Sequence, residues 1–455
     1  MEQELNPYPE YKSVNLNWIL QIPEHWNCER AKNMFDKLNR AVEDTDETIT
    51  CFRDGVVTLR KNRRITGFTE SLKEIGYQGI RKGDLVIHQM DAFAGSVGVS
   101  DSNGKSTPVY SVCVPKNDKY NNYYYAHLIR EMGKNGFIQS LYRGIRERSS
   151  DFRFDTFAKL FLPIPPRPEQ DQIVKFLDFK ISKINKFIKD KKREIELLKE
   201  LKQAEINRAV TKGLNPNVPM KDSGIDWLGE IPEHWEVRRL KSFSDFVNRG
   251  STPLYTEDIL YKVVNQATFS KGFWDLKNIR YTSASIENNR GLLLKEDILL
   301  ASTGGGVLGK CYLFKEEGIY IADSHVSIIR DSKSRFHPEY IYYFLSINYH
   351  LINGILAQGS TNQIELQREW LRSMFFPYPD IKEQLEIATF IVGLEDKINN
   401  LIESIESEII KIQEYKISLI SDVVTGKVDV RDVSIEDAFE METLDEVETE
   451  EIVEE

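Results

Sequence analysis

The sequence has few cysteines and no long apolar run, and both absences narrow the class of protein. Its four cysteines, Cys28, Cys51, Cys113 and Cys311, are scattered and lack the paired spacing of zinc ligands. A disulfide scaffold or a structural zinc site is therefore not expected, and reduced thiols suit a cytoplasmic protein. No segment approaches the roughly 18 apolar residues of a membrane span, and no basic-then-apolar leader opens the chain.

Motifs by which the chain could act as an enzyme on its own are also missing. No glycine-rich nucleotide fingerprint lies in a strand–helix–strand context, and neither half of the chain holds a nuclease set of carboxylates and lysine. Residues 304–310 have the glycine and lysine spacing of a phosphate-binding P-loop, but Cys311 replaces the Ser or Thr that would bind magnesium. Residues 311–314 are expected to form a strand, whereas a P-loop leads into a helix. A glycine-rich loop that lets the backbone approach a ligand closely explains the segment better.

Negative charge is concentrated at one end. The net charge of −11 argues at first against a polyanionic partner. Residues 431–455, however, hold twelve carboxylates and the single base Arg431, so they carry the whole −11. Residues 1–430 are left with 59 basic and 59 acidic groups. We expect residues 428–455 to be a solvated, disordered acidic tail, and the remaining chain has to be judged without it.

An internal repeat organises the chain. Residues 22–26, Ile-Pro-Glu-His-Trp, recur unchanged at 231–235, an offset of 209. A second block, from Pro163 to Thr211, matches Pro377 to Thr425 at an offset of 214. The shared register predicts a tandem duplication, with halves of about 210 residues. We interpret the His and Trp of each Ile-Pro-Glu-His-Trp turn as a structural brace.

Each half combines a mixed part with a long helix. Apolar runs at 84–87 and 297–300 predict strands, and aromatic stretches at 120–130 and 338–347 predict buried helices. The segments from Pro166 to Gly213 and from Pro379 to Gly426 have helix start and stop signals. Apolar residues in these two segments recur at heptad-like spacing: Leu177, Ile184, Ile188 and Ile195, then Ile391, Ile398, Ile405, Ile412 and Leu419. This stripe favours two helices that pair as a rigid antiparallel spacer, roughly 65 Å long. The alternative is that each helix packs on its own globular domain.

These residues together resemble a known family. The segment from Asp222 into the turn at 231–235 is similar to the opening of a target-recognition domain in specificity subunits of Type I restriction-modification systems. Further family-like segments are 249–253, 359–363, the proline-rich step to Glu383-Gln384, and Val424-Thr425-Gly426. The resemblance covers residues 12–430. It implies an α+β fold with two tandem α/β target-recognition domains in a pseudo-two-fold repeat, separated by two long helices that form an antiparallel coiled coil. The expected boundaries are 1–162 and 214–376 for the recognition domains, and 163–213 and 377–427 for the helical spacers.

The resemblance also implies a function. Each recognition domain of such a subunit reads one half of a bipartite, asymmetric double-stranded DNA target, and the helices set the spacer and dock two methyltransferase subunits. Restriction subunits join the full complex. This chain is expected to be non-catalytic and to bind no cofactor, with S-adenosylmethionine, ATP and magnesium on the partner subunits. The alternatives are a stand-alone DNA methyltransferase or nuclease, against which the missing cofactor motifs argue, and a coiled-coil scaffold.

Candidate DNA contacts lie mainly in polar loops. In the first domain the basic clusters are Arg60, Lys61, Arg63 and Arg64, and Arg143, Arg146 and Arg148. Such clusters suit phosphate contacts, although an ordinary solvated turn would look the same. Gln89 and Arg146 suit bidentate base contacts. In the second domain the resemblance places these residues beside DNA: Arg249, Ser251, Thr252, Ser302, Thr303, Lys310, Asn362 and Gln363. His325 is either a further DNA contact or a structural histidine.

Overall fold

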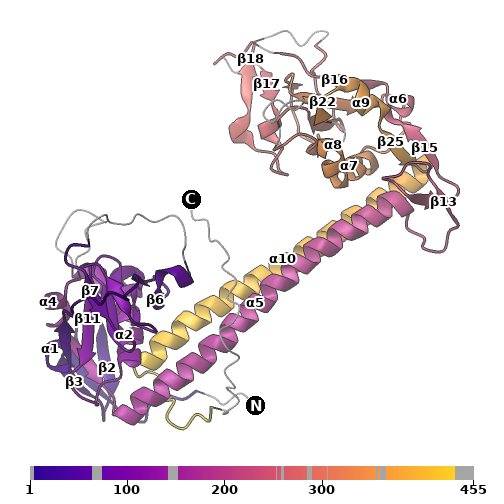
Figure 1. Cartoon of the computed structure of the whole chain (residues 1–455). Helices are drawn as coiled ribbons and strands as arrows, with labels where there is room; N and C mark the ends of the chain where they lie inside the picture. The colour runs from indigo at the N-terminus through magenta and orange to yellow at the C-terminus, as the bar shows by residue number, and fades with distance from the viewer. Residues whose placement is uncertain are drawn as a thin grey trace. The chain divides into compact units, whose positions relative to one another are not determined.

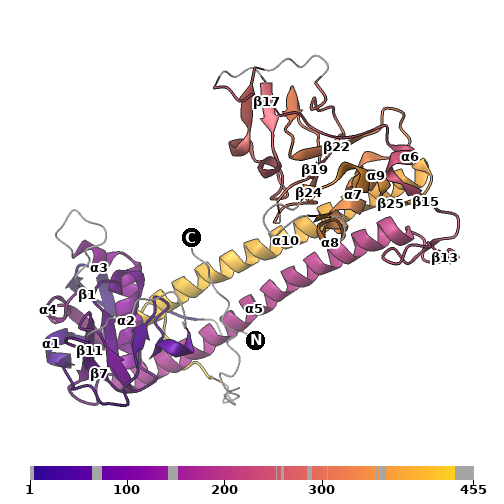
Figure 2. The ribbon, with the colours of Figure 1, turned by 45° about the horizontal axis from the view of Figure 1, so that its top comes forward.

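The structure is a computed structural model that describes residues 5–63, 74–141, 152–252, 254–257, 261–283, 289–304, 306–354, 357–358 and 365–435. The chain forms two compact units, the first from residues 1–190 and 407–455 and the second from residues 191–406. Each unit contains a mixed α/β body and part of two long helices, α5 (Arg167–Lys212) and α10 (Ile381–Val424) (Figures 1 and 2). The predicted tandem α/β repeat and the long helices are confirmed.

The first unit is built around a four-stranded antiparallel sheet in the order β4-β11-β8-β9. The aromatic segment forms α2, which packs beside β8 and β9 and buries Tyr124 and Tyr125 completely. The sheet and this helix comprise β4 (Phe35–Leu38), β8 (Leu85–His88), β9 (Val97–Val99), β11 (Tyr110–Pro115) and α2 (Asn122–Lys134). The other elements are β1 (Tyr11–Leu16), β2 (Ile19–Pro23), β3 (Asn27–Arg30), α1 (Ala31–Met34), β5 (Ile49–Cys51), β6 (Val57–Leu59), η1 (Arg60–Asn62), β7 (Gln78–Ile80), η2 (Ala92–Ala94), β10 (Gly104–Ser106), α3 (Phe137–Ser140), α4 (Phe154–Phe157) and β12 (Phe161–Ile164).

The second unit repeats this sheet as β16-β22-β19-β20 and adds a smaller sheet in the order β18-β17-β21. Its main sheet and aromatic helix are β16 (Phe246–Arg249), β19 (Ile298–Ala301), β20 (Cys311–Leu313), β22 (Val326–Arg330) and α7 (Pro338–Ile347). The other elements are β13 (Met220–Asp222), β14 (Glu230–Pro232), β15 (Glu236–Arg239), α6 (Leu240–Phe243), β17 (Tyr261–Val264), η3 (Gln266–Thr268), η4 (Leu276–Asn278), β18 (Arg280–Thr282), β21 (Tyr320–Ala322), α8 (Tyr349–Gly354), β23 (Ala357–Gln358), β24 (Glu365–Leu366), α9 (Arg368–Ser373) and β25 (Phe375–Tyr378). The glycine-rich segment at 304–310 leads into strand β20, as predicted, and not into the helix that a P-loop requires.

The Ile-Pro-Glu-His-Trp turn is a brace in both units. In the first unit, Trp26 Nε1 donates to Glu169 Oε1 at 2.8 Å, and His25 Nε2 lies 2.8 Å from Glu169 Oε2. In the second unit, Trp235 Nε1 and His234 Nε2 each lie 2.9 Å from Glu383 Oε2. The turn therefore fastens each α/β body to the first turn of a long helix.

The opposite end of each long helix is also fastened to an α/β body. The hydroxyl of Tyr124 on α2 donates to the carbonyl oxygen of Val424, at the end of α10, over 3.0 Å. In the second unit, Tyr340 on α7 makes the same bond to Val210 on α5, also over 3.0 Å. Gly213 follows α5 with a φ of +72° and Gly426 follows α10 with a φ of +76°, the left-handed conformation that favours glycine after a helix.

The predicted heptad residues face inward within their units. Seven are buried, namely Leu177, Ile184, Ile195, Ile391, Ile398, Ile405 and Leu419. The other two, Ile188 and Ile412, are half-buried against the core of the first unit. The helices contact each other inside each unit: Lys416 Nζ donates to Asn185 Oδ1 at 2.7 Å in the first, and Lys202 Nζ to Asn399 Oδ1 at 3.1 Å in the second.

The start of the expected acidic tail packs on the first unit instead of extending into solvent. Val430 is completely buried, and Val433 and Ile435 lie against the same core. Gln172 Nε2 donates to the carbonyl oxygens of Val430 and Val433, at 3.0 and 2.9 Å. The folded body thus reaches residue 435, because these apolar side chains and carbonyl groups find partners there; residues 436–455 lie outside the described part.

The described residues include the cysteines, several possible metal ligands and the two long helices. All four cysteines are free thiols. Among the described residues, no three His, Cys, Asp or Glu side chains are placed to hold a metal ion. No helix in the described part of the chain is both long enough and apolar enough to span a bilayer.

Candidate nucleic-acid interface

One edge of the main sheet in the second unit gathers most of the contact residues predicted for that unit. The strand register places Arg249 opposite Ser327, Ala301 opposite Val326, and Leu300 opposite Cys311. The ends of β16 and β19 therefore lie beside the starts of β22 and β20. Six predicted residues lie at or just beyond these four strand ends: Arg249, Ser251, Ser302, Thr303, Lys310 and His325.

Arg249 is anchored to the short strand β24. Its guanidinium group forms an ion pair with Glu365 and donates to the carbonyl oxygen of Leu366 at 2.8 Å. Thr303 pairs with the backbone of Glu365, and its hydroxyl donates to Gln266 Oε1 at 3.2 Å. Arg249, Thr303 and Gln266 thus form one polar surface, called here the Arg249 surface.

Gln266 is a candidate that the sequence analysis missed. It opens η3, directly after the buried end of β17 at Val263 and Val264. Its amide both donates and accepts, as bidentate contacts to a base edge require. The available signal was a polar Asn265-Gln266 pair directly after a buried apolar run.

His325 lies at the same edge with an oriented ring. Its backbone nitrogen donates to Asp323 Oδ1 at 2.9 Å, and its Nδ1 lies 3.3 Å from Asp323 Oδ2. Asp323 is buried, whereas the His325 side chain is 56% exposed. Because Nδ1 faces the carboxylate, Nε2 is the ring nitrogen that a ligand can reach.

The remaining predicted residues of this unit differ in accessibility. Ser302 is completely buried and its hydroxyl lies 2.6 Å from that of Ser327, so its side chain has no surface with which to contact DNA. Ser251 Oγ is buried and has no hydrogen-bond partner in the described structure. Thr252 is exposed, and Lys310 places Nζ 6.0 Å from the centre of the Tyr349 ring. Asn362 and Gln363 lie outside the described residues.

In the first unit, Gln89 occupies the matching sheet edge. It follows β8, whose last residue, His88, pairs with Tyr110. Gln89 Nε2 donates to Ser111 Oγ at 3.3 Å, and its backbone nitrogen donates to the carbonyl oxygen of Val109 at 3.0 Å. Counted from Asp84 and Asp297, which precede the matching strands β8 and β19, Gln89 takes the place of Ser302.

The basic cluster of the first unit is partly neutralised. Residues 60–62 form η1, where Lys61 Nζ lies 2.6 Å from Glu47, and Arg63 lies 2.7 Å from Asp54. Arg60 donates to Thr50 Oγ1 at 3.2 Å. The Lys61 side chain is nevertheless 60% exposed, so its ammonium group is accessible to a phosphate. Arg64, Arg143, Arg146 and Arg148 lie outside the described residues.

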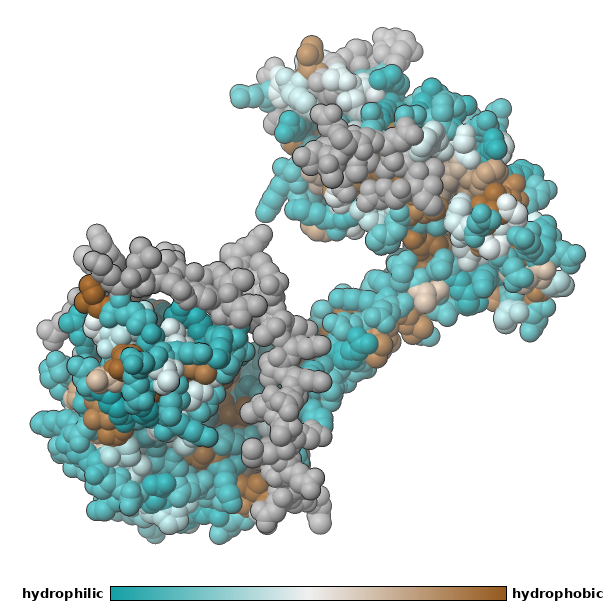
Figure 3. Space-filling model, in the orientation of Figure 1, coloured by the Kyte–Doolittle hydropathy of each residue, from teal (hydrophilic) through white to brown (hydrophobic). Residues whose placement is uncertain are grey.

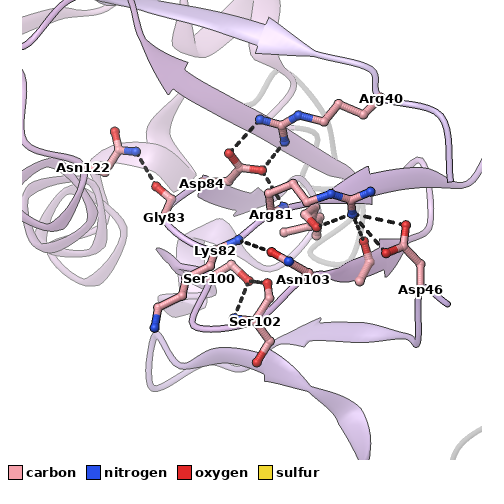
Figure 4. Close-up of polar contacts among 12 residues, drawn as sticks. Arg40, Asp46, Arg81, Lys82, Gly83, Asp84, Ser100, Ser102, Asn103 and Asn122 are labelled. Carbon is pink, nitrogen blue, oxygen red and sulfur yellow. Dashed lines mark hydrogen bonds and ion pairs between the residues drawn. The ribbon is translucent and has the colours of Figure 1, made fainter. Parts of the chain in front are cut away.

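Arg40 and Arg81 of the first unit form structural ion pairs with buried aspartates (Figure 4). Arg40, at the same repeat position as Arg249, donates to Asp84 Oδ1 at 3.0 Å, and Arg81 donates to Asp46 Oδ1 at 3.0 Å. Asp84 also accepts the backbone N–H of Arg81 at 2.7 Å. Lys82 differs, because its exposed side chain points away from this network in Figure 4. The two units therefore use the same arginine position differently.

Comparisons with known proteins agree with this architecture. Two segments, residues 71–197 and 232–411, match the family described as Type I restriction modification DNA specificity domain. The chain is similar to the putative type I restriction enzyme MjaX specificity subunit of Methanocaldococcus jannaschii, with 25% identity over 92% of this chain and 98% of that protein. It is also similar to the type I restriction enzyme EcoBI specificity subunit of Escherichia coli, with 23% identity over 86% of this chain and 85% of that one.

Two solved structures share the fold. One comes from work on complex assembly and conformational transition of the type I R-M system; it has a TM-score of 0.65 and 13% identity, covering 89% of this chain and 99% of that one. The other is the HsdS subunit from Thermoanaerobacter tengcongensis, with a TM-score of 0.58 and 12% identity over 89% of this chain and 98% of that one. With the specificity domain matched in both halves of the sequence, the chain belongs to the family of specificity subunits of Type I restriction-modification systems.

Proposed function

We propose that each unit of this chain reads one half of a bipartite double-stranded DNA target. The observation that carries this proposal is the repeated sheet edge, because the same edge bears different side chains in the two units. At this edge the second unit has the Arg249 surface and His325, and the first has Gln89. The first unit also carries the basic residues of η1, which follows the separate β5-β6 pair. Different donors and acceptors select different bases, so the two half-sites differ and the target is asymmetric.

The contacts divide into two kinds. Gln89, Arg249 and Gln266 have side chains suited to reading base edges, whereas Lys61, Lys82 and Lys310 are suited to phosphates. Arg249 has to exchange its ion pair with Glu365 for a base or phosphate, so DNA binding competes with that pair. Six further contacts are proposed from the sequence alone: Arg64, Arg143, Arg146, Arg148, Asn362 and Gln363.

The long helices act as a ruler in this proposal, paired as an antiparallel coiled coil. Two contacts support the antiparallel pairing: Asn185 with Lys416, and Lys202 with Asn399. From the first contact to the second, the residue number rises by 17 on α5 and falls by 17 on α10. The lysine and the asparagine also exchange helices between the two units, as expected of a duplicated sequence. Inserting one heptad into both helices adds about 10 Å, which is roughly three base pairs of unread spacer.

The same helices are the proposed docking site for two methyltransferase subunits. Phe187 and Tyr415 expose apolar surface in the first unit, and their repeat partners Leu401 and Leu201 do so in the second. Figure 3 shows hydrophobic residues among hydrophilic ones on the visible face of the long helices. Two equivalent patches suit two copies of one partner. We propose that those partners bind S-adenosylmethionine, that restriction subunits with ATP and magnesium complete the assembly, and that this chain itself is non-catalytic.

Footprinting of the full chain with its methyltransferase subunits tests the proposal. We expect two protected DNA segments with an unprotected spacer between them, and a longer spacer after the heptad insertion. A single continuous footprint without sequence preference would contradict two-domain reading. An unchanged spacer would contradict the ruler while leaving the reading of half-sites intact.

A further inference from the structure

Three cations gather where α2 meets α10 in the first unit. Arg130 and Lys134 lie one turn apart on the same face of α2, and Lys416 lies on α10. The two helices are in contact here, because Ser421 Oγ donates to Glu131 Oε1 at 2.8 Å. Figures 1 and 2 both show α2 beside this end of α10. We call Arg130, Lys134 and Lys416 the α2–α10 cation cluster.

Neighbouring residues contact each of the three side chains. The guanidinium of Arg130 packs on Gly55, where a Cβ would lie 2.4 Å from its Cζ, and the buried Arg130 Nε has no hydrogen-bond partner among the described residues. Lys134 is exposed, and its Cε lies 3.6 Å from the place of a Cβ on Gly95. Lys416 is half-buried and donates to Asn185 Oδ1 at 2.7 Å. The two ammonium groups are therefore the accessible part of the cluster.

The positive charge of the cluster is not balanced by its surroundings. Partial burial, and then the charges of the neighbouring cations, lower the pKa of Lys134 and of Lys416, and burial lowers the pKa of Arg130. Asp54 and Glu131 are the carboxylates that oppose these effects. Asp54 is already paired with Arg63 at 2.7 Å, and Glu131 with the Ser421 hydroxyl. Within the described chain, none of the three cations forms an ion pair of its own.

We infer that the α2–α10 cation cluster binds the phosphate backbone of DNA, with Lys134 and Lys416 as the contacting groups and Arg130 as the charge behind them. The inference rests on the proposed function, and it adds a contact that lies away from the sheet edge where bases are read. A DNA strand brings closely spaced phosphates, which relieve the mutual repulsion of the three cations. Contacts of this kind position a duplex without reading its sequence.

The repeat favours DNA over a protein partner. Asn121 and His337 precede α2 and α7, and each donates its backbone N–H over 2.8 Å to the matching glutamine, Gln170 or Gln384. Counted from these two residues, Ser346 stands in the second unit at the position of Arg130, and His350 at that of Lys134. Of the three cations, the second unit keeps only the lysine on the long helix, Lys202. Two copies of one partner subunit would need the same surface twice. A cluster in one unit only suits an asymmetric duplex.

The experiment compares Lys134→Gln and Lys416→Gln with Lys202→Gln, since Lys202 is the repeat partner of Lys416 and the matching positions of Arg130 and Lys134 hold Ser346 and His350. The assembled complex is titrated with a duplex that contains its target and with an unrelated duplex, over a range of salt concentrations. Each phosphate contact contributes about −0.9 to the slope of log K against log salt. We expect each cluster variant to make this slope less negative by about 0.9 on both duplexes, without changing the preference for the target. Lys202→Gln keeps the wild-type slope.

The outcomes separate the two proposals. If the wild type does not prefer its target, the proposed function fails, while the slope on the unrelated duplex still tests the cluster. If the wild type prefers its target but the cluster variants keep its slope, the cluster does not bind phosphate. Loss of methyltransferase subunits from the variants, measured by sedimentation with the slope unchanged, would assign the cluster to protein docking and overturn the inference. Melting temperatures identify any variant that fails to fold.

Discussion

Removing Glu169 should destabilise the first unit far more than removing its repeat partner, Glu383, destabilises the second. Glu169 accepts from Tyr8 Oη at 2.6 Å, from Trp26 Nε1 at 2.8 Å and from His25. Burial, and then the Glu169 carboxylate, raise the pKa of Tyr8, so this hydroxyl remains a donor. Tyr8 and Trp26 are both buried, so Glu169→Ala leaves two buried donors without their acceptor.

The magnitude follows from the partners. A hydrogen bond to a charged group contributes about 1.5–3 kcal/mol, so two buried donors give a loss of about 3–6 kcal/mol for Glu169→Ala. Glu383 accepts from one buried donor, Trp235, and its side chain is 24% exposed, compared with 4% for Glu169. Glu383→Ala should therefore cost about 1–3 kcal/mol. Glutamine at either position keeps a carbonyl acceptor and should cost less than alanine.

Hydrogen exchange of the full chain can assign each loss to its unit. We expect faster exchange in residues 167–190 and 407–424 for Glu169→Ala, and in residues 191–212 and 381–406 for Glu383→Ala, because each brace belongs to one unit. Equal effects of the two substitutions, or a larger effect of Glu383→Ala, would refute the reasoning from burial and donor number.

Three further predictions concern acid stability, the second recognition unit and the C-terminal end. Burial, and then the charges of Arg130 and Lys134, lower the pKa of His127 to about 4. The neutral His127 ring therefore favours the folded state at full strength above pH ~6.5, and this stabilisation is lost as the pH falls towards 4. Denaturation from pH 7 to 4 should show a loss of up to about 3 kcal/mol that His127→Gln reduces, and an unreduced loss would contradict this cause. Gly250→Ala should weaken reading of one half-site, because its Cβ would lie 2.1 Å from the carbonyl oxygen of Ala322. Gly393→Ala, on α10, meets nothing within 4 Å and is the control. Equal DNA affinities of the two variants would count against the Arg249 surface. Truncation after residue 435 should leave half-site choice and melting temperature unchanged. Truncation after residue 427 removes buried Val430 and should lower the melting temperature. A lower melting temperature for the 435 truncation than for the 427 truncation would contradict the packing described for residues 428–435.

The repeat, the long helices and the paired strands were predictable because they leave periodic or duplicated patterns in the chain. The brace was predictable as a unit but not in its chemistry, since the turn at 22–26 and its acceptor Glu169 are far apart in sequence. The same reason explains why the ion pair of Arg249 with Glu365 and the bond between Thr303 and Gln266 were missed. Burial of Ser302 follows from its neighbour Ser327 on an adjacent strand, a contact that only the register reveals. The charge count predicted a disordered tail from residue 428, but the apolar residues at 430, 433 and 435 pack against the core of the first unit.

The central claim is that the two units read separate half-sites, and exchanging residues 231–376 for the corresponding segment of another specificity subunit tests it most directly. Methylated positions in DNA from cells that carry the hybrid complex would then be mapped and compared with those of the wild type. We predict that one half-site changes to that of the donor subunit, while the other half-site and the spacer length stay the same. A change in both half-sites, or in neither, would contradict independent reading by the two units.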